Sequence, residues 1–170
     1  MQTLLRPVLD RWRFFALLAS AAMLAIAHAF QTFGGLAPCE LCLKQRTVYW
    51  VAGGIAAVAM VAVRTPGGPR FREASCWLLA VVFLVGAGVA SYHAGAEWKF
   101  WPGPQECSGG GSVSIAALKD LLNGAGMKMP ACDRPAWVFA GLSMAGWNAV
   151  ASVILVALSI AAAIRERRKA

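Results

Sequence analysis

Charged residues are scarce in this sequence. Only 14% of its 170 residues are Asp, Glu, Lys or Arg, whereas 59% are hydrophobic. Soluble domains carry about a quarter of their residues as charged side chains, so this composition excludes an ordinary soluble domain. The charges that are present are therefore expected to gather at the ends of apolar segments.

Negatively charged residues are rarer than positively charged ones, with 8 Asp and Glu against 16 Lys and Arg. Ten of the cations and three acids lie near residues 6–13, 64–73 and 165–169, whereas the other six cations accompany five acids. By the positive-inside rule, these three segments are predicted to be cytoplasmic. Membrane topology thus accounts for the excess of basic over acidic residues, and nucleic-acid binding is not predicted.

Four apolar runs are long enough to cross a bilayer as helices, and they lie near residues 14–33, 43–63, 74–92 and 144–164. Such a helix needs about 20 residues to cross about 30 Å of hydrocarbon. The second run reaches that length only if it begins near Leu43, with Lys44 and Arg46 extending to the interface. The sequence predicts an all-α fold, an integral membrane four-helix bundle formed by a single domain over residues 1–170, with both termini cytoplasmic.

The segments near 34–42 and 93–136 are predicted to be outer loops. The longer one contains turn-rich stretches of Gly, Pro and Ser on both sides of Cys107. After them, Ser114 can cap a short helix whose leucine and isoleucine side chains share one face. The prediction is therefore a long extracytoplasmic loop that carries a short amphipathic helix.

Four of the five cysteines fall in these outer segments: Cys39, Cys42, Cys107 and Cys132. Disulfides persist outside the cytoplasm, and four cysteines allow three pairings. A bridge between Cys107 and Cys132 would close a loop of about 26 residues, which is worth on the order of 3 to 4 kcal/mol. That value suits a structural bridge as well as a reactive one. Cys76, near the cytoplasmic end of the third run, is predicted to be an inert buried thiol.

The stretch Cys39-Glu-Leu-Cys42 has the spacing of a redox-active pair. If a helix begins near Pro38, Arg46 lies one turn beyond Cys42, where the guanidinium and the helix N-terminus favour the thiolate. Glu40, between the two cysteines, acts against thiolate formation. The small loop favours thiol exchange over static bridges. No metal site is predicted, because the second pair lacks the spacing of zinc ligands and no histidine is adjacent.

Together these motifs resemble the disulfide bond formation protein B (DsbB) family. The resemblance rests on Cys39-x-x-Cys42-x-x-x-Arg46, on the second cysteine pair in the second outer loop and on the four runs. It extends to Tyr92-His93 and to the segment 141–147, so it covers nearly the whole chain. It implies a quinone-dependent protein-disulfide oxidoreductase of the bacterial inner membrane, multi-pass, with its cysteine loops in the periplasm.

The resemblance also implies a role for each site residue. A reduced DsbA-like thioredoxin-fold oxidase would attack the Cys107–Cys132 disulfide at Cys107, and exchange would then pass the electrons to Cys39 and Cys42. Cys42 would reduce a membrane quinone, either ubiquinone or menaquinone, which Arg46 and His93 would help to bind. DsbA, near −120 mV, is already a strong oxidant, so a terminal acceptor is needed.

Two other readings compete with this one. A four-helix enzyme resembling vitamin K epoxide reductase uses similar cysteine chemistry, but that family places its Cys-x-x-Cys late in the chain. The other alternative is a non-catalytic tetraspan scaffold with structural disulfides. Loss of quinone reduction on substitution of Cys42 would separate an enzyme from such a scaffold.

Overall fold

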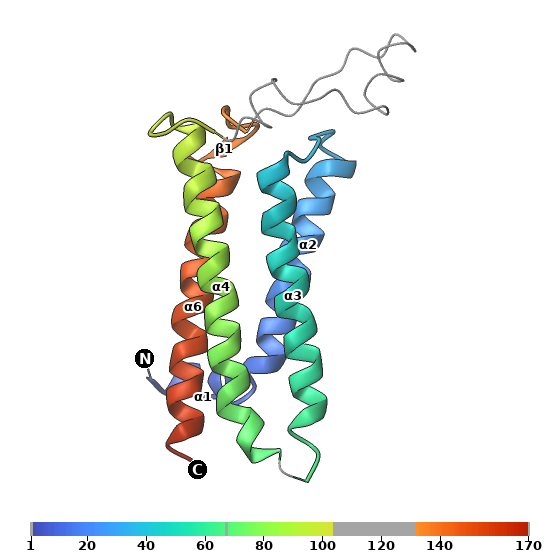
Figure 1. Ribbon diagram of the computed structural model, residues 1–170, viewed down its shortest axis with the longest axis vertical. Coiled ribbons are helices and arrows are strands. Elements are labelled where there is room, and N and C mark those ends of the chain that lie inside the picture. Colours follow the sequence, from blue (N-terminus) through green and yellow to red (C-terminus); the bar gives the residue numbers. More distant parts are fainter. Residues whose placement is uncertain (1, 67, 104–131, 170) are drawn as a thin grey trace.

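The computed structural model describes residues 2–66, 68–103 and 132–169, and these residues are mostly helical (Figure 1). The helices are α1 (Gln2–Asp10), α2 (Trp12–Thr32), α3 (Glu40–Ala62), α4 (Pro69–Glu97) and α6 (Met144–Arg167). A small antiparallel hairpin pairs β1 (Val138–Phe139) with β2 (Leu142–Ser143) just before α6. The predominance of helix agrees with the predicted fold class. The amphipathic helix expected after Ser114 lies outside the described residues.

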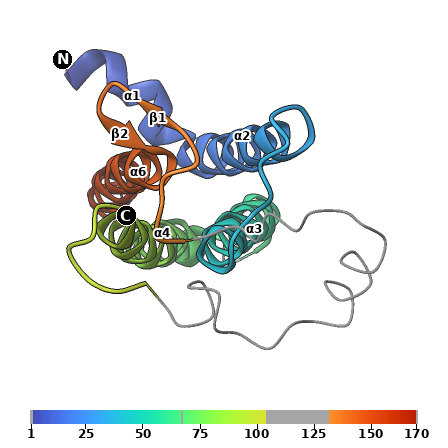
Figure 2. The same ribbon diagram turned by 90° about the horizontal axis from the view of Figure 1, so that it is seen from above.

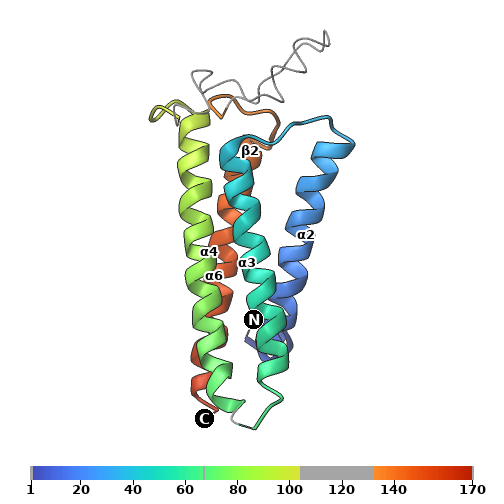
Figure 3. The ribbon, with the colours of Figure 1, turned by 45° about the vertical axis from the view of Figure 1, so that its right-hand side comes forward.

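The four long helices run side by side along one axis (Figures 1 and 2). α4 packs along α6, α3 packs against both α2 and α4, and α2 has few contacts with α4 or α6. The N- and C-termini lie at one end of the bundle, whereas the start of α3 and the end of α4 lie at the other (Figure 3). The predicted cysteine site is therefore at the end remote from both termini.

Three of the helices that the structure describes are long and apolar enough to cross a membrane: Trp12–Thr32, Phe71–Glu97 and Met144–Arg167. α3 has 23 residues, but its first two turns include Glu40, Lys44 and Arg46, which lower its apolar content. Three of the four predicted spans thus meet both criteria. Whether α3 is the fourth span remains a prediction.

Small residues set the spacing between the helices. A Cβ added to Gly86 of α4 would lie 2.9 Å from Val48 of α3 and 3.6 Å from Ser152 of α6. Gly88, one half-turn further along, has no atom of another element within 4 Å of that position. α3 and α4 therefore approach each other closely at Gly86, which places their outer ends near one another.

The α4 helix extends beyond the predicted end of its apolar run at residue 92 and ends at Glu97. Trp101 folds back over Gly95, where an added Cβ would clash with the indole ring. The indole Nε1 donates a hydrogen bond of 2.8 Å to the carbonyl of Tyr92, and the two rings are stacked. The extra turn places His93 and Glu97, four residues apart, on one face of a helix.

Candidate redox site

Cys39 is the N-cap residue of α3. Its backbone is extended, with φ −79° and ψ 171°, and its Sγ accepts a hydrogen bond of 3.2 Å from the backbone N–H of Cys42. The helix therefore begins at Glu40, two residues after Pro38 and close to the start that the sequence predicts. Cys39 is only 4% exposed, whereas Cys42 is partly exposed.

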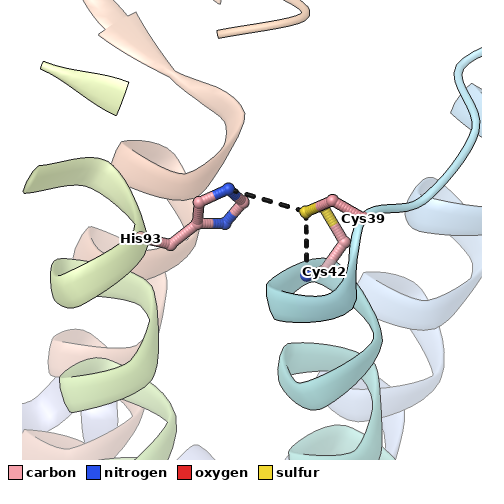
Figure 4. A group of neighbouring side chains, drawn as sticks. All are labelled: Cys39, Cys42 and His93. Atoms are coloured by element: carbon pink, nitrogen blue, oxygen red, sulfur yellow. Dashed lines mark hydrogen bonds between the residues drawn. The ribbon is translucent and has the colours of Figure 1, made fainter. Parts of the chain in front are cut away.

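The two sulfur atoms of this pair lie 2.7 Å apart (Figure 4). The hydrogen bond from the Cys39 thiol lowers the pKa of Cys42 to about 7, although burial opposes that shift. The same hydrogen bond, together with burial, raises the pKa of Cys39. Cys42 is thus the thiolate of the reduced pair near neutral pH, with Cys39 as its hydrogen-bond donor.

His93 projects from α4 toward this pair, and its Nε2 lies 3.6 Å from Cys39 Sγ (Figure 4). The side chain is buried. The structure therefore places a histidine beside the thiols, although no histidine is near them in the sequence. Cys39, Cys42 and His93 offer three ligand atoms within 4.8 Å of one another.

A chain of buried side chains holds the far side of the His93 ring. Nδ1 lies 2.8 Å from Gln45 Nε2, and the oxygen of the same amide accepts from Asn148 Nδ2. Asn148 in turn accepts from the Tyr49 hydroxyl, which lies 3.1 Å from Ser152 Oγ. Because the Gln45 nitrogen can only donate, His93 Nδ1 is an acceptor and Nε2 carries the hydrogen that faces Cys39.

Glu97 is a member of the site that sequence reasoning missed. It is only 8% exposed, and its Oε1 lies 3.7 Å from His93 Nε2. Its Oε2 has no hydrogen-bond partner among the described residues. Its position four residues after His93 was the available signal, but that signal depends on α4 continuing past its apolar run. Glu97 opposes thiolate formation at Cys42.

Arg46 lies on α3 one turn after Cys42, and its side chain reaches α2. It donates hydrogen bonds of 2.6 Å to Gln31 Oε1 and 3.0 Å to the carbonyl of Ala27. Its charge favours the Cys42 thiolate, as expected, but less than the Cys39 hydrogen bond does. The guanidinium thus joins α2 to α3 beside the redox pair.

Glu40 has a smaller part than the sequence suggests. Its carboxylate lies 3.6 Å from the Lys44 ammonium, and both side chains are about half exposed. Solvent screens such charges strongly. The carboxylate that acts on Cys42 is instead that of Glu97, which is buried.

Cys132 lies beside the Cys39–Cys42 pair. It is 0% exposed and belongs to one buried cluster with Cys39 and Leu41, against which Cys42 packs. Cys132 is disulfide-bonded, and Cys107, its predicted partner, lies outside the described residues. An ion pair of 2.6 Å between Lys99 and Asp133 joins the segment after α4 to this second cysteine.

Cys76 lies apart from the site, near the start of α4. It is fully buried, 3.8 Å from the Arg13 guanidinium. This agrees with the buried thiol that the sequence predicts.

A thiol pair capping a helix, with another cysteine packed on it and three apolar helices beneath, defines a membrane-bound disulfide oxidoreductase. Residues 10–162 match the family model described as disulfide bond formation protein DsbB, and the chain belongs to that family.

Named relatives agree with this assignment. A disulfide bond formation protein B of Methylococcus capsulatus is 34% identical over 82% of this chain and 85% of its own. Proteins of the same name from Marinobacter nauticus and Dechloromonas aromatica are 30% and 29% identical, over 92% and 89% of this chain and 93% and 90% of theirs. No solved structure matches the chain.

Proposed function

We propose that this protein reoxidises a periplasmic DsbA-like thioredoxin-fold oxidase and passes the electrons to a membrane quinone. The observation that carries the proposal is the burial of Cys132 in one cluster with Cys39, against which Cys42 also packs. Exchange between two cysteine pairs requires a thiolate to reach a disulfide sulfur. Packing of the two cysteine segments against each other supplies that proximity.

Two electrons pass through two successive thiol–disulfide exchanges. A thiolate of the partner attacks Cys107 of the Cys107–Cys132 disulfide, and Cys132 leaves as a thiolate. The second partner thiol then closes the partner's own disulfide and releases Cys107. The two loop thiols next reduce the Cys39–Cys42 disulfide in the same manner, so that two electrons and two protons reach this pair.

The residues around Cys42 fit a quinone carbonyl. Arg46 uses two of its N–H groups on α2, and a guanidinium has five. His93 presents Nε2–H beside the thiols, while the exposed Leu43 gives the same turn of α3 an apolar surface. A bound quinone would supply the two-electron acceptor. Arg46 and His93 would orient it and stabilise negative charge on its oxygen.

We further propose that α3 crosses the membrane as the fourth span, and that both termini are cytoplasmic. α3 leads from the outer end of α2 back to the start of α4, and both termini lie at that opposite end (Figure 3). An even number of crossings is required for that arrangement. The basic segments at the terminal end support cysteines on the periplasmic side, and the family supports placement in the bacterial inner membrane.

The test measures quinone reduction by reduced DsbA with purified protein. Cys42→Ser is expected to abolish this activity while the protein still inserts and unfolds normally, whereas Cys76→Ser, the matched control, retains it. Absence of quinone reduction in both the unaltered protein and Cys42→Ser would favour the alternative, a non-catalytic tetraspan scaffold with structural disulfides.

Arg46→Ala separates the two half-reactions. Loss of the Arg46 guanidinium is expected to slow quinone reduction by about 100-fold or more. This is the size of effect seen when one charge-stabilising group is removed. Disulfide exchange with DsbA, measured without quinone, is expected to change by less than about threefold. Equal losses in both assays would contradict the role assigned to Arg46.

A further inference from the structure

We infer that the reduced Cys39–Cys42 pair, with His93 and Glu97, binds a thiophilic divalent cation such as Zn²⁺. The bound cation would hold the enzyme in its reduced state. The binding itself is independent of the proposed function. The inhibition of catalysis by the bound cation rests on the proposed function.

The distances between the donor atoms suit a tetrahedral zinc site. Zinc–sulfur bonds of about 2.3 Å and zinc–nitrogen bonds of about 2.0 Å place S and N about 3.6 Å apart and two sulfurs about 3.8 Å apart. Cys39 Sγ and His93 Nε2 are 3.6 Å apart, and the two sulfurs are 2.7 Å apart. The thiols must therefore separate by about 1 Å, which a side-chain rotation at the partly exposed Cys42 can provide.

Glu97 is the candidate for the fourth ligand, and its carboxylate must rotate toward the sulfurs, because of these four residues only Cys39, Cys42 and His93 have donor atoms within 4.8 Å of one another. In tetrahedral coordination, nitrogen and carboxylate oxygen ligands lie about 3.4 Å apart. Glu97 Oε1 is 3.7 Å from His93 Nε2, and the side chain is more than nine-tenths buried. The Ser143 hydroxyl donates to this carboxylate, but Oε2 has no partner among the described residues, and a buried carboxylate oxygen without a partner is costly. A cation between Glu97 and the thiols would remove that cost.

Metal binding requires a lone pair on His93 Nε2, so the ring hydrogen must lie on Nδ1. The buried amides allow this change, because rotating both through about 180° reverses every hydrogen bond in the chain. Gln45 then accepts from Nδ1–H and donates to Asn148, which donates to Tyr49, which donates to Ser152. Each group keeps its partner, and His93 gains the supporting acceptor that zinc-bound histidines usually have.

The reaction with the metal is an acid–base step without electron transfer. Two thiol protons are released, two thiolates and one carboxylate face a divalent cation, and no group changes oxidation state. Arg46 offsets part of the remaining negative charge. The disulfide form has no thiolate to offer, so binding is specific to the reduced pair.

The experiment uses the full chain in detergent, reduced and then freed of reductant under anaerobic conditions. Zn²⁺ is titrated against a chromophoric chelator, and Cd²⁺ is titrated while thiolate-to-cadmium absorbance is recorded. One ion per chain is expected for the reduced protein and none for the oxidised protein. This comparison needs no substitution and is therefore independent of folding defects.

Variants then identify the ligands. Cys42→Ser is expected to abolish binding at micromolar Zn²⁺, and Cys76→Ser, which removes a buried thiol elsewhere, is expected to leave it unchanged. Glu97→Gln and Gln45→Met are each expected to weaken Zn²⁺ binding about 10-fold to 100-fold, the usual effect of losing a supporting group. Equal affinity in Glu97→Gln and the unaltered protein would overturn the four-residue site.

A final assay links binding to turnover. Addition of one equivalent of Zn²⁺ to the reduced enzyme is expected to prevent quinone-dependent reoxidation, and a chelator is expected to restore it. Absence of metal binding by the reduced chain would overturn the inference whatever the quinone assay shows. One-to-one binding in a chain that shows no quinone reduction before metal is added would support the metal site and reject the proposed function instead.

Discussion

Gln45 lies between His93 and Asn148, and its amide decides which imidazole nitrogen carries the hydrogen. As placed, the amide nitrogen faces His93, so the ring is a donor toward Cys39. The four side chains that are hydrogen-bonded in series, Gln45, Asn148, Tyr49 and Ser152, are all buried. Water therefore does not compete for their hydrogen bonds. The redox pair therefore has a neutral, oriented donor beside it.

The pKa of Cys42 gives a prediction for reactivity. Below pH 7 this residue is a thiol, and above pH 7 it is a thiolate, because its pKa is lowered to about 7. Alkylation of the reduced protein by iodoacetamide is expected to rise about tenfold per pH unit below 7 and to level off above it. Cys39, with its raised pKa, is expected to react slowly throughout.

Mass spectrometry of the alkylated peptide reports which sulfur has reacted. The rise through pH 7 should disappear in Cys42→Ser. A rise that follows Cys39 instead would mean that the proton of the pair lies on the other sulfur.

Tyr49 gives a prediction for stability. Tyr49→Phe removes the hydroxyl that donates to Asn148 and lies 3.1 Å from Ser152, so two buried groups lose a partner. The expected cost in the free energy of unfolding is about 1 to 3 kcal/mol. Tyr92→Phe is the matched control, because the exposed Tyr92 hydroxyl makes only a 3.4 Å contact with the carbonyl of Pro102. Its expected cost is below about 0.5 kcal/mol, measured by unfolding in detergent.

At the scale of elements, the approach of α3 to α4 determines whether the thiols meet His93. The two helices approach closely at Gly86, about 10 Å along α4 from His93. Val48 opposes it, about 9 Å along α3 from Cys42. A change in helix separation at Gly86 is therefore transmitted directly to the redox pair.

Gly86→Leu is expected to force α3 away from α4, because its side chain would meet Val48 and Ser152. Overpacking of this kind costs about 1 to 3 kcal/mol. Exchange within the site is expected to slow as well, since Cys39 moves away from His93. Gly88→Leu, whose side chain meets no other element, should leave unfolding and exchange unchanged. Similar unfolding temperatures for the two variants would show that the helices are not held by contact at Gly86.

The elements were more predictable from sequence than the site. Apolar runs place most of the helices because a span must satisfy its own backbone, and Pro38 with Cys39 marks where α3 begins. Local patterns could not place His93 beside Cys39, which is 54 residues away. Glu97 was missed because α4 continues past its apolar run, where the indole of Trp101 packs on Gly95. Such tertiary contacts leave no periodic signal.

The whole molecule has its termini at one end and its redox pair at the other (Figures 1 and 3). That polarity gives a topology prediction. In intact cells, a membrane-impermeant maleimide is expected to label Phe100→Cys, because Phe100 is 77% exposed just after α4. Lys169→Cys, exposed after α6, should be labelled only after the membrane is permeabilised. Labelling of both cysteines in intact cells would contradict an even number of crossings.

Contacts between the two ends of the chain also fix the order in which the protein can be completed. The indole of Trp12 donates to Ser159 across 147 residues, and Arg165 forms an ion pair of 2.8 Å with Asp10. During synthesis, α1 and α2 are made well before α6, so their contacts with α6 are absent until α6 has been synthesised. The contacts of Trp12 and Asp10 with α6 can therefore form only after α6 is made, and a nascent chain halted before α6 should expose Trp12 to lipid or to an insertion factor.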